Sequence, residues 1–330
     1  GWLTTLILMT TIGGVGFLAN AFSFNFVFAG FCFILAIAGY GVFHNVSFSY
    51  LTSATNRRSL GTAIGNFTAV GDIGRIPFTA LAGFISAFPV LGISGWRIVS
   101  MLYGVGTLLF SGWVYGSSLS LREKISPNGL LSADTKKYFP AFSLLRHSRY
   151  ALPISANVLD AIGSDQFFAF LPFLLFAKNI DPKIIGLFAL VFTVGCFGGK
   201  IACGRLVDRL GTHKVFIAAD LVMSLLLGVL VVATQPLLIL GTSLLLGFVT
   251  KGTIPVVQTI VVEPVEEKDK YDDVFTMSTF SRGTTNIITP IIFGLIASHY
   301  GVIWIYFMMA VAAFCAVLPV LTMNKSNEPM

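Results

Sequence analysis

Two carboxylates lie in one apolar stretch in the second half of the chain. Asp160 and Asp165 are accompanied there by the amides Asn157 and Gln166. An ionised side chain at the depth of a lipid bilayer costs at least about 2.5–3.5 kcal/mol, so such groups commonly mark function. A buried carboxylate that binds and releases a proton supplies the chemistry of a proton-driven process. Helical spacing predicts that Asn157, Asp160 and Ser164 share one stripe. Because the carboxylates are five residues apart, we expect them to face different points, with Asp165 the deeper one.

Other ionisable residues of the apolar runs suggest ion pairs. Asp72 and Arg75 are three residues apart, which places them on one helix face and allows a local pair. Asn66 is expected on the same face. Two interpretations are open for this group, a structural ion pair or part of a substrate or proton site. Asp220 is expected to pack against Lys200.

Two basic residues complete the set of charges expected at depth. Lys251 is followed by Pro255, and a helix break within a membrane is tolerated where the backbone lines a cavity. Arg282 lies about ten residues into the run 272–298, near Asn286. The two cations are expected either to bind an anion together or to pair with Asp72 or Asp165.

The composition shows what kind of element positions these residues. Only 11% of the residues are charged, 55% are hydrophobic, and the mean hydropathy is +0.84. A soluble domain has about 25% charged residues, so the composition excludes a soluble or a disordered protein, and it argues against nucleic-acid binding despite the net charge of +6. A spanning helix needs about 20 apolar residues. We predict an all-α, polytopic protein of the lipid bilayer with helices at 2–22, 24–51, 60–88, 96–116, 150–177, 183–203, 213–233, 236–262, 272–298 and 301–323.

The distribution of Lys and Arg predicts the domains and the orientation. Residues 117–149 form the longest polar segment and are rich in basic residues, so by the positive-inside rule this connector is cytoplasmic. We predict a four-helix bundle at 1–116, the connector, and a six-helix bundle at 150–323. Residues 324–330 then form a cytoplasmic tail, and both termini lie on the cytoplasmic side of the cell membrane.

Motifs of other protein classes do not occur in the sequence. The four cysteines lie in apolar runs without a C-x-x-C pair, and the histidines lack metal-ligand spacing. No Walker-type phosphate loop and no hydrolase or metalloprotease motif is present. We therefore predict no disulfide, no metal, no cofactor and no enzymatic activity.

Small residues indicate where helices approach each other. Glycines spaced three to five residues apart favour close helix contacts within lipid. Such spacings occur at Gly61/Gly65, Gly71/Gly74 and Gly199/Gly204.

An internal repeat relates the two halves. An offset of 211 residues pairs Gly83 with Gly294, and it places the Arg57-Arg58 turn on Lys268-Asp269. The repeat predicts two parallel halves. Since four helices precede the connector and six follow it, two helices are expected to be missing before residue 1.

One loop carries the most specific string of the chain. Residues 204–214 read GRLVDRLGTHK, in which Asp-Arg stands four residues after a Gly and is followed by a second Gly and a basic pair. This string resembles the signature loop of the major facilitator superfamily, with matches at Gly204, Asp208, Arg209, Gly211 and Lys214 and with His213 in place of the first basic residue. The resemblance implies two six-helix bundles, with this loop after the second helix of the second bundle.

The expected role of this loop is a conformational latch. Asp208 is expected at the positive N-terminal end of a neighbouring helix, and Arg209 is expected to pair with an acidic group. Such contacts would exist in one state of an alternating-access cycle and break in the other.

The same resemblance suggests a function. Within the superfamily, GVFH at 41–44 and GDIGRIP at 71–77 are similar to the drug-efflux branch, in particular to fosmidomycin-resistance-type proteins. The resemblance implies a monomeric secondary transporter of a small molecule, driven by protons, with efflux of a drug or small organic solute favoured. Uptake of a small organic anion, a non-transporting receptor and an inactive remnant are the alternatives.

Overall fold

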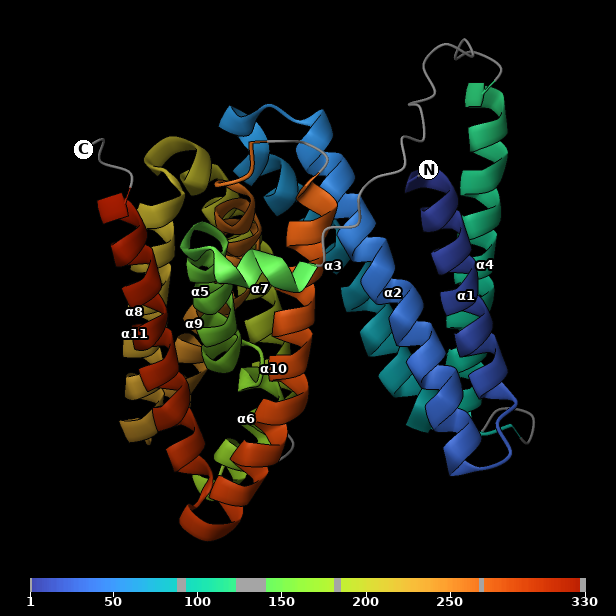
Figure 1. Ribbon diagram of the computed structural model, residues 1–330. Coiled ribbons are helices and arrows are strands. Elements are labelled where there is room, and N and C mark those ends of the chain that lie inside the picture. Colours follow the sequence, from blue (N-terminus) through green and yellow to red (C-terminus); the bar gives the residue numbers. More distant parts are fainter. Residues whose placement is uncertain (1, 88–92, 123–140, 181–184, 267–269, 327–330) are drawn as a thin grey trace. The chain divides into compact units, whose positions relative to one another are not determined.

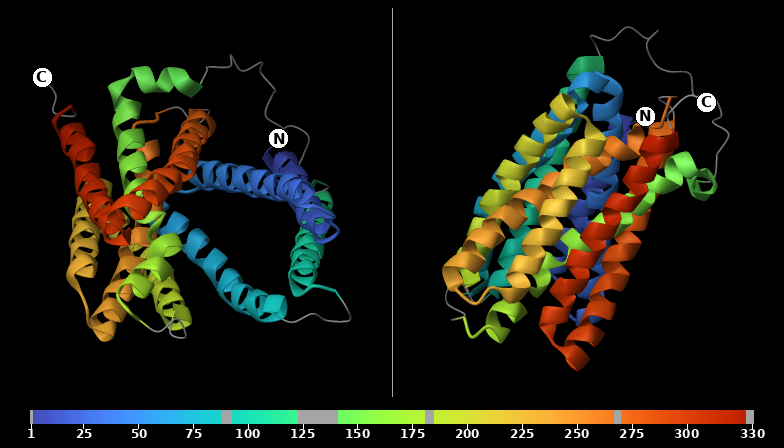
Figure 2. Two further views of the ribbon diagram at one scale, coloured as in Figure 1. Left: turned by 90° about the horizontal axis from the view of Figure 1, so that it is seen from below. Right: turned by 90° about the vertical axis from the view of Figure 1, so that its left-hand side faces the viewer.

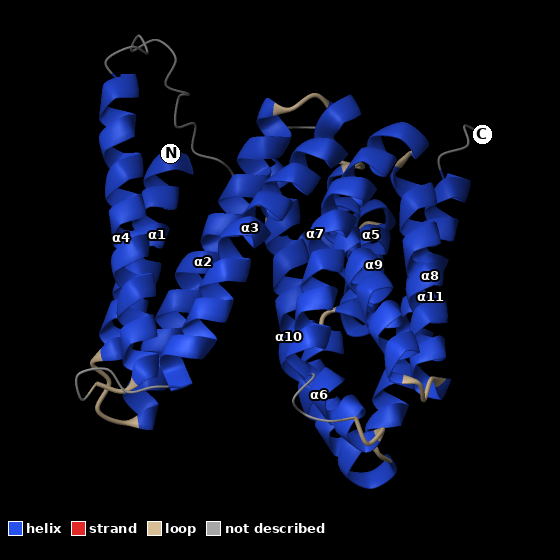
Figure 3. Cartoon of the chain, turned by 180° about the vertical axis from the view of Figure 1, so that it is seen from behind, coloured by secondary structure: helices blue, strands red, loops and turns tan. Residues whose placement is uncertain are grey.

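Helices account for all regular secondary structure that the structure describes. The computed structural model describes residues 2–87, 93–122, 141–180, 185–266 and 270–326. Within these ranges no strand is present (Figure 3). The helices are α1 (Trp2–Ala21), α2 (Phe26–Ala54), α3 (Leu60–Ala87), α4 (Gly95–Arg122), α5 (Ser148–Ser164), α6 (Phe167–Ala177), α7 (Ile185–Leu210), α8 (Thr212–Val232), α9 (Pro236–Val262), α10 (Tyr271–Tyr300) and α11 (Val302–Ser326), with short 3₁₀ helices at Arg57–Ser59 and Ala141–Arg146.

The predicted membrane helices are confirmed, with two changes. Every predicted segment is helical, and eight helical stretches of the described residues are long and apolar enough to span a bilayer. The predicted segment 150–177 consists of two helices, α5 and α6, rather than one. The predicted segment 183–203 ends seven residues later, at Leu210, so most of the signature string is helical. The chain is therefore an all-α multi-pass membrane protein.

Single glycines separate two pairs of consecutive helices. Gly211 stands between α7 and α8 with φ of 89°, and Gly301 stands between α10 and α11 with φ of 94°. Residues with a Cβ avoid this left-handed region, whereas glycine occupies it freely. The chain can thus reverse direction at one residue at each of these points.

One compact unit comprises residues 1–50 and 74–139. In it α1 and α4 lie side by side (Figure 1). Polar contacts between them include the hydroxyls of Thr11 and Ser111, 2.8 Å apart, and the Asn20 amide, which donates to Ser100 Oγ at 3.1 Å. Gly104 of α4 permits the close approach, because a Cβ there would lie 2.6 Å from the backbone nitrogen of Leu18.

The other compact unit comprises residues 51–73 and 140–330. It therefore contains the first half of α3, which the sequence assigns to the first bundle, together with α5–α11. Helices α8 and α11 run side by side, as do α5 and α11 (Figure 2). Helix α7 packs tightly on α9, where a Cβ at Gly199 would lie 1.9 Å from the carbonyl oxygen of Phe248. The apolar core lies toward the α6 end and includes Phe167, Leu171, Leu174, Phe188, Met223, Leu227, Leu246, Phe293, Tyr306 and Met309.

The 211-residue repeat is visible in the helix boundaries. With a shift close to 211 residues, α1 corresponds to α8, α2 to α9, α3 to α10 and α4 to α11. The packing repeats as well, because α1 packs on α4 as α8 packs on α11. Helix α10 begins at Tyr271, which is 211 residues after the first residue of α3, Leu60. The weak sequence repeat thus predicts the helix order correctly.

Candidate functional site

The break between α5 and α6 brings two carboxylates to one cation. Helix α5 ends at Ser164, and Asp165 and Gln166 form a turn before α6 begins at Phe167. Asp160 is on the last full turns of α5, and Asp165 is on the turn itself. The expectation that residues five apart must face different points is wrong, because it assumes a continuous helix. Both carboxylates instead contact the guanidinium of Arg282 from α10.

Arg282 is the centre of this network. Its Nε and Nη2 donate to the two oxygens of Asp165 at 2.7 and 2.9 Å, a bidentate pair. Its Nη1 donates to Asp160 Oδ2 and to Asn157 Oδ1, each at 2.8 Å. Its Nη2 also donates to Ser164 Oγ at 3.2 Å. The predicted stripe of Asn157, Asp160 and Ser164 is confirmed, since all three contact one side chain.

A second cation and two amides extend the network. Lys251 of α9 donates to Asp165 Oδ1 at 2.9 Å, and Asn286 Nδ2 donates to Asp165 Oδ2 at 3.0 Å. Gln166 Nε2 lies 3.4 Å from the side-chain oxygen of Asn286. Of the two carboxylates expected as partners of Lys251 and Arg282, Asp72 and Asp165, the second contacts both cations. We refer to Asp160, Asp165, Lys251 and Arg282 as the charged network.

The charged network is neutral and almost closed to solvent. Its two carboxylates and two cations balance, and the Asp160 side chain is fully buried. Lys251 is the most accessible member, with 25% of its side chain exposed, compared with 12% for Asp165 and 16% for Arg282. On the side away from Arg282, Asn157 Nδ2 donates to Ser278 Oγ at 2.9 Å and holds the amide in place. Ser278 therefore supports the charged network through Asn157, and its role was not predictable because a lone serine in a helix carries no pattern.

A separate ion pair joins α3 to α7. Lys200 Nζ lies 2.6 Å from Asp72 Oδ2, and both side chains are about nine-tenths buried. The prediction that Lys200 packs against Asp220 is therefore wrong. Asp72 has a cation from another helix, and the side chain of its predicted partner, Arg75, lies outside the described residues. Asn66 is exposed and does not share the face of Asp72.

The signature string lies beside the same pair of helices. Asp208 is on the last turn of α7 rather than in a loop, and its two oxygens accept from the backbone N–H groups of Gly61 and Thr62, each at 2.8 Å. These amides belong to the first turn of α3. The N–H groups of a first turn have no hydrogen-bond partner within the helix, and they carry the positive end of the helix dipole. The predicted position of Asp208 at a helix N-terminus is confirmed.

The other members of the string are less engaged. Gly204 allows contact with α3, since a Cβ there would lie 2.5 Å from the carbonyl oxygen of Gly61. Gly211 provides the turn to α8. Arg209 and Lys214 are exposed, and no acidic partner of Arg209 is found among the described residues. Next to them, Arg57 donates to the carbonyl groups of Glu263 and Val265 at the end of α9.

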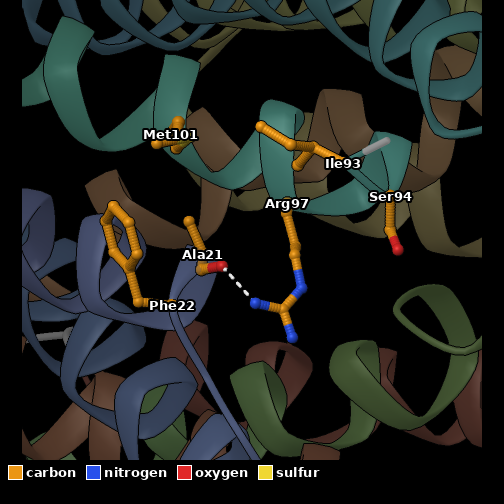
Figure 4. A pocket seen from close by; sticks show the side chains of 6 residues that line it. All are labelled: Ala21, Phe22, Ile93, Ser94, Arg97 and Met101. Atoms are coloured by element: carbon orange, nitrogen blue, oxygen red, sulfur yellow. Dashed lines mark hydrogen bonds between the residues drawn. The ribbon is translucent and has the colours of Figure 1, made fainter. Parts of the chain in front are cut away.

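A surface pocket is present in the first compact unit, and none of the residues of the charged network line it. It has a volume of about 310 Å³ and is lined by residues at the end of α1 and around the start of α4 (Figure 4). Arg97 points into it and donates to the carbonyl oxygens of Ala21 and Ser23 at 3.1 and 2.7 Å. These bonds satisfy the end of α1, which gives Arg97 a structural role.

Comparisons with known proteins agree with this arrangement. A family model described as Major Facilitator Superfamily matches residues 154–329. Comparison with curated protein sequences finds no match.

Solved transporter structures share the fold. The transporter FucP in the outward conformation superposes with a TM-score of 0.75 at 15% identity, covering 98% of this chain and 83% of FucP. A bacterial homologue of the iron transporter ferroportin gives 0.77 at 14% identity, with 98% and 84% covered. The human organic anion transporter MFSD10 gives 0.74 at 13% identity, with 97% and 77% covered. These proteins are transporters, and at such identities the likeness concerns the fold. Because the family model spans more than half of the residues, the chain belongs to the Major Facilitator Superfamily.

Proposed function

We propose that the protein is a secondary active transporter that moves a small molecule by alternating access and is coupled to protons. Efflux of a drug or small organic solute is the favoured direction. The observation that carries the proposal is the charged network, which is buried where α5 breaks into α6.

The energetics favour a role in transport over a role in stability. Buried ion pairs are often replaced by apolar residues at no cost in stability, so a neutral network of four buried charges is a poor way to stabilise a scaffold. Within a membrane such residues characteristically mark substrate and proton pathways. Broken helices lined with polar groups form the central sites of many secondary transporters. A polar substrate group would replace one partner of Arg282 or Lys251.

The contacts between α3 and α7 support an alternating cycle. Asp208 at the α3 N-terminus and the Lys200–Asp72 pair both join the same two helices. We assign them to one state of the cycle and expect both to separate in the other state. The signature string then lies on the cytoplasmic side of the cell membrane, as the excess of basic residues at this end favours.

Uptake of a small organic anion by the same fold is the second candidate. Lys251 favours it, because its ammonium group has three donors and is the most exposed member of the charged network. An incoming carboxylate or phosphate would find these donors before it reached Arg282.

A transport assay tests the proposal. Purified protein in liposomes is loaded with a panel of cationic, neutral and anionic solutes, with the vesicle interior either acidic or alkaline relative to the bath. We expect one solute class to accumulate against its gradient when the pH gradient is present and to stop when a protonophore is added.

Variants decide whether the charged network carries the transport. Asp165→Asn is expected to abolish gradient-driven transport, and Asp72→Asn is the corresponding variant of the α3–α7 pair. Glu266→Gln is the control, because that carboxylate is 84% exposed. Full coupled activity in both Asn variants would contradict a proton-carrying role for these carboxylates. Binding without counterflow would favour a receptor, and the lack of both would favour an inactive protein.

A further inference from the structure

Asp220 is a buried acid that forms no ion pair with any residue in the described part of the chain. It lies on α8, is 0% exposed, and neither of its carboxyl oxygens makes a hydrogen bond to any described protein group. Lys200, the partner expected from the sequence, is bound to Asp72. An ionised carboxylate without hydrogen bonds in such a place is very costly, whereas a neutral carboxylic acid costs far less.

The charged groups that act on Asp220 belong to the charged network. Asp160 of α5, which contacts α8, and Arg282 of α10 both lie within electrostatic reach of it. Asp160 uses only one oxygen for Arg282, and its Oδ1 makes no hydrogen bond to a described group. Asp160 and Asp220 therefore each present unpaired carboxyl oxygen within one buried region.

The other ionisable groups around α8 are already engaged or distant from Asp220 along the helix. On the helices packed against α8, Lys251 of α9 is bound to Asp165, Lys200 of α7 is bound to Asp72, and Tyr306 of α11 donates to the Phe167 carbonyl. Asp208 of α7 accepts from backbone amides of α3, Arg205 and Arg209 of α7 are exposed, and Cys203 of α7 is a buried thiol. On α8 itself, His213 lies 3.7 Å from Glu263 and Lys214 is exposed. The charged network is neutral by itself. A charge on Asp220 would thus be an uncompensated negative charge, and one proton on the Asp160–Asp220 pair restores neutrality.

We propose that Asp220 is the proton-carrying side chain of the transport cycle and exchanges its proton with Asp160. The proposal rests on the proposed function. In the conformation described, Asp220 is the neutral acid and Asp160 is ionised against Arg282. When substrate draws Arg282 away, the Asp160 carboxylate loses its cation and takes the proton from Asp220. In this transfer one O–H bond breaks and one forms, and no electrons are transferred. The Asp220 carboxylate that results has no cation of its own and then takes up a new proton.

The depth of the two residues gives the transfer a direction. Asp220 is eight residues from the start of α8, and Asp160 is twelve residues from the start of α5. At a rise of 1.5 Å per residue these are about 12 and 18 Å of helix from the end that carries the signature string. Asp220 therefore lies between that end and the network. His213 is seven residues before Asp220 on the same face of α8, and its Nε2 also makes no hydrogen bond to a described group.

The carboxylates proposed above are less suited to this task. Asp165 accepts from Arg282, Lys251 and Asn286, and Asp72 is held by Lys200. Protonating either one would leave a buried cation without its partner. Asp220 can be neutral in one state without this cost, and this property distinguishes a proton carrier from a structural anion.

Infrared spectroscopy tests the proton on Asp220 without knowledge of the substrate. Wild-type protein in liposomes is titrated across the neutral and alkaline range, and the carbonyl band of protonated carboxylic acids is recorded. We expect one buried acid band that is lost in Asp220→Asn, shifted in Asp220→Glu and unchanged in Glu266→Gln. An identical band in wild type and Asp220→Asn would overturn the proposal. So would loss of the band on adding NaCl at constant pH, which would assign the pair to a metal cation.

Flux measurements test whether that proton is used. With a solute identified by the panel above, one coupled proton gives about tenfold accumulation per pH unit. We expect Asp220→Asn to lose this accumulation while counterflow, which moves no net proton, continues, and Asp220→Glu to retain part of it. Gradient-driven accumulation by Asp220→Asn equal to wild type would overturn the proposal. If wild-type protein transports none of the solutes, the proposed function fails, and the infrared result still decides whether Asp220 holds an exchangeable proton.

Discussion

The second compact unit contains two sets of buried charges that are built on different plans. In the charged network, Arg282 joins two carboxylates, one of which also binds Lys251, so that every member has a partner in common with another. Between α3 and α7, by contrast, Lys200 and Asp72 form a simple pair. When one residue of the network moves, several ion pairs are broken at once. When Lys200 and Asp72 move apart, a single ion pair is broken. We infer that the network suits ligand binding and that the pair suits opening and closing.

The largest expected effect comes from removing the centre of the network. Arg282→Met leaves Asp160 and Asp165 without their main cation, and breaking a buried ion pair in this way costs about 3–5 kcal/mol. Arg282→Lys is expected to recover part of the loss, since it keeps the charge but not the bidentate geometry. Thermal unfolding in detergent, followed by tryptophan fluorescence, measures both. Arg205→Met, at an exposed arginine of α7, is the control. Equal unfolding temperatures for Arg282→Met and the control would contradict the central role of Arg282.

The next largest effect distinguishes the Lys200–Asp72 pair from the charged network by the stability of double variants. Lys200→Met alone leaves the Asp72 carboxylate buried and unpaired, with an expected loss of about 3 kcal/mol. The double variant Lys200→Met/Asp72→Asn is expected to recover most of this loss. The matching double variant Arg282→Met/Asp165→Asn is not, because Asp160 and Lys251 still lack partners. A double-mutant cycle on unfolding temperature measures the difference. Similar recovery in both cycles would show that the two regions do not differ in the way described.

A smaller effect is expected where α3 touches α7 through backbone. A Cβ at Gly65 would lie 2.5 Å from the carbonyl oxygen of Lys200, while a Cβ at Gly71, two turns further along α3, has nothing within 4 Å. Gly65→Ala is expected to cost about 1–3 kcal/mol by overpacking, and Gly71→Ala is expected to be neutral or slightly stabilising. Unfolding temperatures of the two alanine variants test this directly. A lower unfolding temperature for Gly71→Ala than for Gly65→Ala would place the helix contact elsewhere on α3.

Local and pattern-based features of the molecule were predictable from the sequence. Continuous apolar runs predict the helices, and the repeat predicts their order in both halves. Glycine spacing correctly indicates the contacts at Gly61, Gly65 and Gly199, although Gly71 has open space around it. The position of Asp208 follows from the signature string, because a carboxylate at the end of one helix is well placed to meet the free amides of the next.

Features that depend on tertiary packing were not predictable. The break between α5 and α6 lies at a short polar stretch that contains no proline. Without such a signal, the sequence predicts a continuous helix, in which Asp160 and Asp165 would face different points. Lys200 had two buried carboxylates as candidates, Asp72 and Asp220, and only the packing of α3 on α7 selects the first. Sequence distance carries no information on such a choice, because both carboxylates lie in apolar runs of similar character.

Substitution of Asp208 is expected to cause the smallest change in stability. The same small change in free energy is nevertheless enough to shift the equilibrium between two conformational states. Asp208→Asn puts an amide donor against one of the two backbone N–H groups of α3, and the loss of a helix-terminal contact costs about 1–2 kcal/mol. If that contact exists in one state only, 1.4 kcal/mol shifts the equilibrium between the states about tenfold. Spin labels at the exposed positions Ser59 and Arg205 would report this as a second, longer distance between α3 and α7. Asp208→Glu keeps the charge and is expected to retain more of the short distance. An unchanged distance distribution in Asp208→Asn would mean that the carboxylate caps α3 in both states, and the Lys200–Asp72 pair alone would then distinguish them.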